Sequence, residues 1–377
     1  MKFQSIILLC LSVLLGSVPV WAAEVTAEQI QLTLPPAIYT VPNSEMSLYF
    51  QNSVLYEPAS DLKFAVFCDI GHQQADRWII EPERNQVGMH KLTLTVSDQA
   101  GNEIVSASSI VHVAPREAGT GKQLRLLIIG DSLTHATIYP NRIHQLCSRP
   151  DNPELSFLGT HKPTSAAEGV AHEGYGGWAW ETFLTRYVPA EKSDGTYRTR
   201  SSPFVRLDEN GKPVVDIQDY INNHCYGVPP DIVVFKLGIN DCFRADQQNP
   251  DARIDEVLNH ADQLISEFRK AAPEALFGIC LTTPGNSRDE AFDANYQGKY
   301  TRRGWKQIQH RLVQRYIAHF GNRENKRISL IPTETNLDIT AGYPDNNAVH
   351  PNKAGYEQIG DSIYAWLKFQ LTPKKGT

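Results

Sequence analysis

Three short segments of the sequence carry residues that could act together in nucleophilic catalysis. Ser132 follows Gly-Asp, Asn240 follows Gly-Ile, and His350 stands between valine and proline. A serine hydroxyl becomes an effective nucleophile when a neighbouring histidine removes its proton. An asparagine amide can donate a hydrogen bond to the negatively charged oxygen that forms when a carbonyl is attacked. Together these residue types favour acyl transfer.

Each of these residues also has an ordinary structural explanation. Aspartate, serine and threonine commonly cap helices, so Ser132 and its neighbours could simply begin one. Gly and Asn often end a strand, which would account for Asn240. His350 is one of 12 histidines in the chain. The functional interpretation therefore depends on where these residues lie relative to the secondary structure.

A fourth segment, residues 172–180, reads His-Glu-Gly-Tyr-Gly-Gly-Trp-Ala-Trp. A glycine such as Gly177 lets a backbone N–H approach a ligand closely, and aromatic side chains suit sugar rings or acyl groups. We expect Tyr175, Trp178 and Trp180 to contact substrate. The alternative is an aromatic loop packed on the core, which we expect for at least one of the two tryptophans.

The elements that would position these residues alternate between strands and helices. Apolar strand-like runs occupy residues 124–129, 232–237, 276–281 and 328–331, and helical patterns end near 147 or span 254–271, 305–320 and 354–371. Continuous apolar strands between helices predict an α/β fold with a parallel sheet covered on both faces. Active sites in such sheets lie at the carboxyl ends of strands, where Ser132 and Asn240 both fall.

The amino-terminal part of the chain follows a different pattern. Within residues 24–114, short runs alternate between apolar and polar side chains, with Pro, Gly, Asn and Asp in the gaps. This pattern predicts an all-β sandwich domain, with an immunoglobulin-like topology as the first hypothesis. The Cys-Trp-Cys spacing of antibody domains is missing, so the topology is left open. We predict a polar linker at residues 115–123, and an α/β domain at residues 124–372 that would carry the catalytic residues.

Residues 1–23 have the features of a secretory signal peptide. Lys2 is followed by a short apolar run and then by small residues, with cleavage expected after Ala22 or Ala23. The run is too short to span a bilayer, and no other segment is apolar enough to do so. We therefore expect an exported protein, in a periplasm or outside the cell.

Charge and cysteine content exclude some classes of function. The formal net charge is -6, without a cluster of basic residues, so we expect no nucleic-acid partner. After signal-peptide removal five cysteines remain at irregular spacing, which gives neither a zinc pattern nor a disulfide framework. Cys225 and Cys242 flank one predicted strand and could pair, whereas buried free thiols are expected for most. The sequence gives no indication of the oligomeric state.

The order of the four segments resembles that of the SGNH hydrolase superfamily, also called GDSL esterases and lipases. Its conserved blocks match Gly-Asp-Ser-Leu at 130–133, Gly177, Gly-Ile-Asn-Asp at 238–241 and Val-His-Pro at 349–351, and the resemblance covers residues 124–371. It implies a flavodoxin-like three-layer α/β/α sandwich. It also implies that Ser132 is the nucleophile and His350 the base. The oxyanion hole would comprise the N–H groups of Ser132 and Gly177 with the Asn240 side chain, without a metal or cofactor.

One position departs from the family pattern. The family usually has an aspartate three residues before the histidine, to orient its ring and stabilise the imidazolium. Asn347 stands there in this chain. Asp345 could take the role if the loop bulges, Asn347 could orient the ring without charge, or a backbone carbonyl could support a Ser-His dyad. We favour Asp345.

The second block resembles the version found in carbohydrate acetylesterases. Together with export and the β-domain, this favours a carbohydrate O-acyl ester, most simply an O-acetyl ester, as substrate. Arg244 could contact an anionic sugar or merely cap a loop. The alternatives are a secreted lipase or lysophospholipase of the same fold, and a glycan-binding protein with an inactive hydrolase domain. Activity on aryl esters of increasing acyl length would separate the acetylesterase from the lipase, and binding of acetylated glycan without acetate release would favour the inactive domain.

Overall fold

A six-stranded parallel sheet forms the centre of the larger part of the molecule. The computed structural model describes residues 29–373, so the predicted signal peptide lies outside the described residues. The strands run in the spatial order β11 (Glu154–Leu158), β10 (Gln123–Gly130), β15 (Ile232–Lys236), β16 (Leu276–Cys280) and β17 (Ile328–Ile331), and β12 (Glu173–Gly174) also pairs with β10. The predicted parallel sheet is thus confirmed. The order of its five main strands is that of flavodoxin, 2-1-3-4-5.

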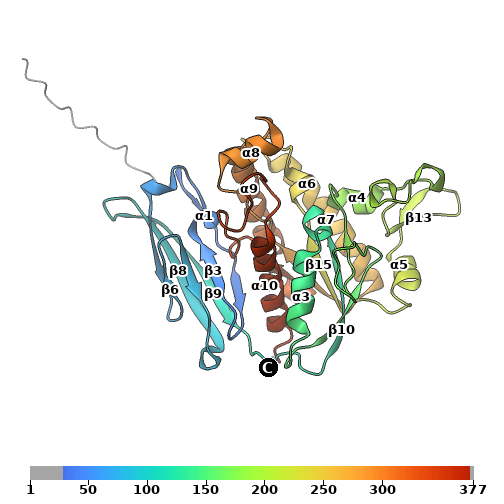
Figure 1. The fold of residues 1–377 in the computed structure, drawn as a ribbon, viewed down its shortest axis with the longest axis horizontal. Helices are drawn as coiled ribbons and strands as arrows, with labels where there is room; N and C mark the ends of the chain where they lie inside the picture. Colours follow the sequence, from blue (N-terminus) through green and yellow to red (C-terminus); the bar gives the residue numbers. More distant parts are fainter. Residues whose placement is uncertain (1–28, 374–377) are drawn as a thin grey trace, which may run out of the picture.

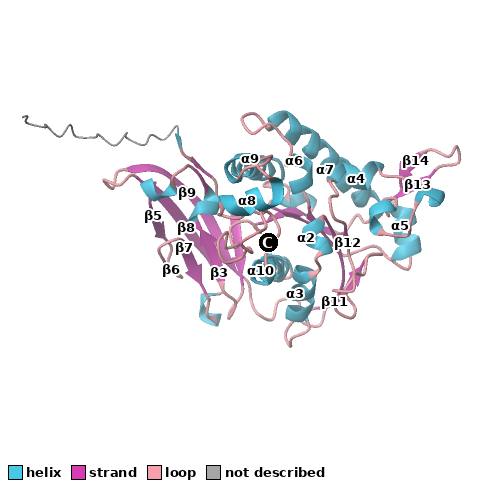
Figure 2. Ribbon diagram, turned by 45° about the horizontal axis from the view of Figure 1, so that its top comes forward, coloured by secondary structure: helices cyan, strands magenta, loops and turns pink. Residues whose placement is uncertain are grey.

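Helices cover both faces of this sheet. Figure 2 shows α3 (Ile138–Cys147) and α10 (Lys353–Gln370) on one side, and α7 (Asp251–Ala271) and α9 (Arg302–Phe320) on the other. Helix α5 (Ile217–His224) packs against α7. The remaining short elements are α2 (Ser132–His135), α4 (Trp180–Thr185), α6 (Ile239–Cys242), α8 (Asp289–Tyr296), β13 (Val205–Leu207) and β14 (Pro213–Val215).

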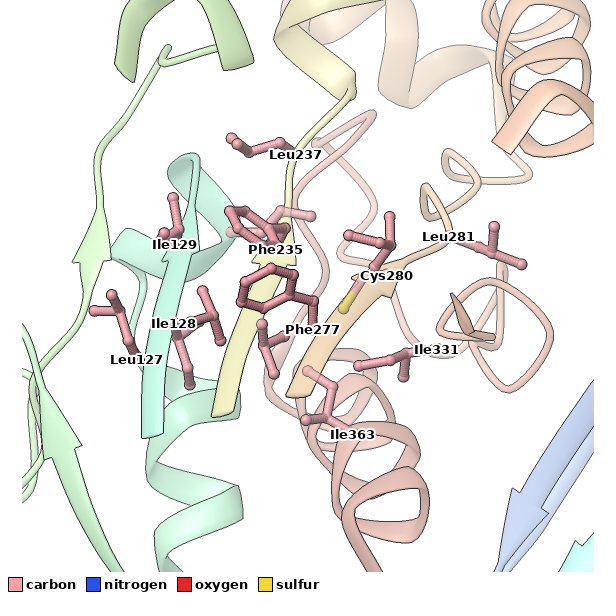
Figure 3. Packing of buried hydrophobic residues seen from close by; sticks show 14 of the residues in the cluster. Leu127, Ile128, Ile129, Phe235, Leu237, Phe277, Cys280, Leu281, Ile331 and Ile363 are labelled. Atoms are coloured by element: carbon pink, nitrogen blue, oxygen red, sulfur yellow. The ribbon is translucent and has the colours of Figure 1, made fainter. Parts of the chain in front are cut away.

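The sheet is apolar on both faces because both faces are covered. Ile128 and Phe235 from neighbouring strands are fully buried, as is Phe277 on β16. Figure 3 shows these side chains packed together, with Ile331 of β17 beside them and Ile363 of α10 below. This packing explains why the strands read as unbroken apolar runs in the sequence.

The amino-terminal strands form two further sheets. One has the order β2 (Ala37–Thr40), β9 (Glu103–Val113), β8 (Gly88–Ser97), β5 (Lys63–Phe67), and the other β3 (Met46–Tyr49), β7 (Arg77–Ile80), β6 (His72–Gln73). A separate pair joins β1 (Gln31–Leu32) and β4 (Val54–Leu55). Leu48, Trp78, Leu92 and Val111 are among the residues of a buried cluster contributed by both sheets. The immunoglobulin-like topology stays a prediction.

Buried hydrogen bonds tie the amino-terminal strands to the α/β part of the chain. The backbone N–H of Ser47 donates to Asn336 Oδ1 at 2.8 Å. Asn52, in the short helix α1 (Phe50–Ser53), donates from Nδ2 to the carbonyls of Glu334 and Leu337, both at 2.8 Å. Figure 1 shows α1 and the amino-terminal strands beside α9 and α10. The chain segment between β9 and β10 is therefore not the only connection between these two parts.

The structure confirms the expectation of buried free thiols for most of the cysteines. All five cysteines of the described residues are free thiols, so Cys225 and Cys242 do not form a disulfide. Both are buried, and burial raises the pKa of each thiol, to about 11 for Cys225 and about 12 for Cys242. Such thiols are unreactive near neutral pH. Within residues 29–373, none of the helices is long and apolar enough to cross a membrane.

Replacing Asn52 with alanine should destabilise the whole protein. The substitution leaves two buried carbonyls without their donor, which costs about 1–3 kcal/mol for each such group left unsatisfied. Urea unfolding should therefore begin at lower denaturant than in the wild type. The matched control is Asn325→Ala, at an exposed site, which should change stability by less than about 0.5 kcal/mol. Equal midpoints for both variants would show that this contact contributes nothing.

Candidate active site

The structure brings Ser132 and His350 together at the carboxyl end of β10. Ser132 Oγ lies 2.9 Å from His350 Nε2, a distance that suits proton transfer. Ser132 is the first residue of α2, which Asp131 caps by accepting a hydrogen bond from the N–H of Leu133 at 2.9 Å. The capping explanation from the sequence therefore holds for Asp131, while Ser132 faces the histidine.

Close packing explains the glycine that precedes Asp131. A Cβ atom at Gly130 would lie 1.9 Å from Thr134 Oγ1, far inside contact distance. Thr134 cannot easily move, because it is fully buried and its hydroxyl is hydrogen-bonded to Tyr139 Oη at 2.6 Å. Only glycine lets β10 turn into α2 this tightly and leave Ser132 at the surface of the cleft.

Asn240 and Gly177 line the same cavity as Ser132 and His350, which has a volume of about 810 Å³. Asn240 lies in α6, directly after β15, and its Nδ2 donates to the carbonyl of Trp178 at 2.9 Å. The amide has two N–H groups, so the second can serve a ligand. Gly177 has a φ of +82°, a left-handed conformation that favours glycine. The four residues thus surround one space.

The structure corrects the expectation for Asp345. Its side chain is 91% exposed and lies 3.5 Å from Arg288, away from His350. Asn347 takes the position next to the histidine, with Oδ1 3.1 Å from His350 Nδ1 and 3.0 Å from its backbone N–H. The loop does not bulge, so the residue three before the histidine keeps the contact. The ring is oriented by an amide oxygen without a full charge.

Two asparagines hold the loop of His350, a role that the sequence analysis assigned to neither of them. Asn286 Nδ2 donates to the carbonyls of Pro344 and Asn347, at 2.8 and 3.0 Å. Asn295 Oδ1 accepts from the N–H of Ala348 at 2.7 Å. Asn286 lies in the segment after β16, at the same edge of the sheet, so the rule that sites lie at carboxyl ends of strands could have indicated it. Its partners are too far along the chain for any local pattern to show the contact.

Burial sets the ionisation of the groups around Ser132. It lowers the pKa of His350, which favours the neutral ring that can accept a proton. Burial also raises the pKa of Asp131 to about 6, while the positive charge of the buried Lys236 opposes that rise. The pKa of Asp241 is raised to about 7 by burial, and its Oδ1 accepts from the N–H of Trp180 at 3.0 Å. Asp241 thereby ties the end of the 172–180 segment to α6.

The predicted aromatic substrate contacts are wrong in this structure. Tyr175 and Trp180 are fully buried and Trp178 is 3% exposed. The Trp180 Nε1–H donates to Tyr316 Oη at 2.9 Å, and the rings of Tyr175 and Trp178 pack with centroids 4.3 Å apart. Large aromatic rings gain more free energy from burial in the core than from partial exposure in a cleft. The segment of residues 172–180 therefore presents the backbone of Gly177 to the cavity, while its aromatic side chains pack inside.

Other side chains form the walls of the cavity. Phe243, Tyr296 and Tyr300 are partly exposed and line it. They come from the C-cap of α6, from α8 and from the segment before α9. Arg244 lines it as well, and the structure gives this exposed side chain no hydrogen bond or ion pair within residues 29–373. The suggestion that Arg244 caps a loop therefore has no support in the structure.

A carboxylate in place of Asn347 should raise the pKa of His350. A negative charge beside Nδ1 stabilises the imidazolium, whereas the wild-type ring experiences burial without that charge. The pKa of His350 in Asn347→Asp, followed by NMR titration of its ring protons, should therefore exceed the wild-type value. The control Asp345→Asn removes an exposed charge on the same loop and should leave the titration nearly unchanged. A larger shift in the control would return the orienting role to Asp345.

Comparison with known proteins adds a family to this geometry. A family model described as GDSL-like lipase/acylhydrolase matches residues 126–363, and none of the curated proteins matches. Among solved structures, a family 3 carbohydrate esterase of Clostridium thermocellum is 15% identical, covers 67% of this chain and 100% of its own, and has a TM-score of 0.39. A family 3 carbohydrate esterase from Talaromyces cellulolyticus is 17% identical, with 66% and 98% covered and a TM-score of 0.40.

A third similar structure covers more of the chain. It is a family two carbohydrate esterase from Clostridium thermocellum in complex with cellohexaose, 13% identical, with 88% of this chain and 94% of that chain covered and a TM-score of 0.36. The family model matches most of the chain, including Ser132, Asn240 and His350. The protein therefore belongs to the GDSL-like lipase/acylhydrolase family and is an ester hydrolase.

Proposed function

We propose that the protein removes O-acyl groups, most simply O-acetyl groups, from a carbohydrate. The observation that carries this proposal is the 2.9 Å contact between Ser132 Oγ and His350 Nε2 at the surface of an open cavity. A neutral histidine at that distance can take the serine proton as the oxygen attacks an ester carbonyl.

The reaction would proceed in two halves. In the first, Ser132 Oγ bonds to the carbonyl carbon, and the negative oxygen is stabilised by Asn240 Nδ2 and by the N–H groups of Ser132 and Gly177. His350 then returns its proton to the departing sugar oxygen, leaving an acyl-enzyme. In the second half, His350 takes a proton from water as the water oxygen bonds to the acyl carbon. The bond between that carbon and Ser132 Oγ then breaks, His350 returns the proton to Oγ, and the free acid leaves.

The walls of the cavity support a sugar as the alcohol part of the ester. The ring centroid of Phe243 lies 5.0 Å from that of Tyr296 and 4.6 Å from that of Tyr300. Such a cluster gives apolar ring faces together with tyrosine hydroxyls, which suits the C–H faces and hydroxyls of a sugar. Arg244 adds a guanidinium with unused donors at the same wall. A long acyl chain would instead need a continuous apolar groove.

Residues 1–23 support export as part of the same proposal. A basic start, a short apolar run and two alanines at positions 22 and 23 are typical of a cleaved secretory signal. An exported esterase would meet polysaccharides outside the cytoplasm.

Acetate release from acetylated polysaccharides tests the proposed reaction. We expect the wild type to release acetate from at least one of acetylated xylan, glucomannan and pectin, and Ser132→Ala to release none. A series of aryl esters should show a fall in rate from acetyl to octanoyl. A preference for octanoyl would favour a lipase. Binding of acetylated glycan without release of acetate would favour an inactive hydrolase domain.

Asn240→Ala should lower kcat for aryl acetate by about 10²–10³-fold, the usual cost of losing one oxyanion donor. KM should change little, because the lost hydrogen bond forms mainly in the transition state. The matched control is Asn249→Ala, which lines the same cavity at an exposed position and should keep nearly full activity on this small substrate. An unchanged kcat in Asn240→Ala would remove that residue from the oxyanion hole.

A further inference from the structure

A second cavity opens at the opposite end of the parallel sheet from Ser132. Its volume is about 890 Å³, within the range of roughly 300–1,000 Å³ found for ligand pockets. Leu124, Ile232, Leu276 and Ile328 line it, and each lies at the start of a sheet strand. Strands rise about 3.3 Å per residue, so the length of β10 puts this cavity about 25 Å from Ser132. It cannot belong to the catalytic site.

Aromatic rings from both parts of the molecule form one wall of this cavity. Tyr39 and His112 come from β2 and β9, and Phe369 comes from the end of α10. The ring centroid of Phe369 lies 4.4 Å from that of His112 and 5.0 Å from that of Tyr39. Tyr39 is 7% exposed, whereas His112 and Phe369 are half-buried. Two rings therefore offer part of their surface to a ligand.

The imidazole at this wall favours a neutral partner. Burial lowers the pKa of His112, so the ring carries no charge at neutral pH. An uncharged ring beside Phe369 provides an apolar surface, and it does not attract an anion. Sugar rings stack on such surfaces through their C–H faces.

The charged residues around the cavity balance one another. The lining contains three basic and three acidic side chains: Lys122, Arg125 and Arg327, and Asp231, Glu274 and Glu324. Arg125 pairs with Asp231 at 3.1 Å, and Arg327 lies 3.7 Å from Glu274. A nucleic acid would need a net positive lining and a lipid tail an apolar one. Balanced donors and acceptors beside aromatic rings suit a neutral ligand rich in hydroxyl groups.

An open surface continues from the aromatic wall. Met89 on β8 lies directly opposite His112 in the sheet register and is 75% exposed. Further along the same sheet, Phe67 on β5 is 79% exposed and pairs with Thr93, whose hydroxyl bonds that of Ser108. Apolar side chains and hydroxyls thus extend along this face of the sheet beyond the cavity. A chain-like ligand that leaves the cavity could continue along that face.

We propose that this cavity is a second binding site, which holds a stretch of neutral, unacylated oligosaccharide apart from the catalytic centre. Holding a polysaccharide there would raise the effective concentration of its ester groups near Ser132. The inference is drawn from the lining of this cavity, so a test of the catalytic substrate neither supports nor contradicts it.

Isothermal titration of the full-length Ser132→Ala protein with cellohexaose, xylohexaose and mannohexaose tests this site. We expect at least one of the three to bind, and His112→Ala or Phe369→Ala in that background to weaken binding about fivefold or more, because each ring contact contributes on the order of 1 kcal/mol. The matched control Tyr226→Ala removes a 95% exposed ring outside both cavities and should bind as before.

Two further measurements separate a lost site from a misfolded protein. The single variant His112→Ala, which keeps Ser132, should hydrolyse aryl acetate at close to the wild-type rate. Its midpoint of urea unfolding should be unchanged. Gln370→Ala, which alters a polar side chain of the lining, should also weaken binding. No binding of any hexasaccharide would overturn the proposal. So would binding that Arg244→Ala abolishes and His112→Ala leaves intact, because the sugar would then occupy the catalytic cavity.

Discussion

The contact between Ser132 and His350 depends on two segments that approach each other from distant parts of the chain. Ser132 is fixed by the tight turn from β10 into α2, where a side chain at Gly130 would collide with Thr134. His350 is fixed by Asn347, which Asn286 holds through its backbone carbonyl. Parallel strands end at one edge of the sheet, so a serine after β10 and a histidine before α10 can meet there.

The amino-terminal strands take part in the same arrangement. Asn52 bonds the carbonyls of Glu334 and Leu337, in the segment that follows β17 and leads towards the His350 loop. A buried amide that satisfies two carbonyls restricts the path of that segment, because leaving either group unpaired would cost free energy. The β-part of the molecule therefore supports the catalytic edge from outside the sheet, and it also contributes two rings to the second cavity.

Much of the architecture could be predicted because local patterns of apolar and polar residues determine it. The unbroken apolar runs at β10, β15, β16 and β17 predicted buried parallel strands, and the positions of Ser132 and Asn240 followed from them. The predicted substrate contacts were wrong because the same local pattern of aromatic residues is compatible with two structures. Tyr175, Trp178 and Trp180 could have lined a cleft, but they pack in the core, because that is where large rings bury most surface. Short elements such as β11 and α5 carry too few residues for a clear periodicity.

The sequence by itself determined the residue types available for chemistry and the strand ends at which they lie. Only the tertiary structure decided which of them meet. Asp345 and Asn347 are two residues apart, and only the path of the loop turns the first towards Arg288 and the second towards His350. The same holds for Asn286, whose Nδ2 donates to two carbonyls that lie about sixty residues away along the chain. Side-chain contacts of this range depend on how loops pack on one another, and local sequence carries no periodic record of that packing.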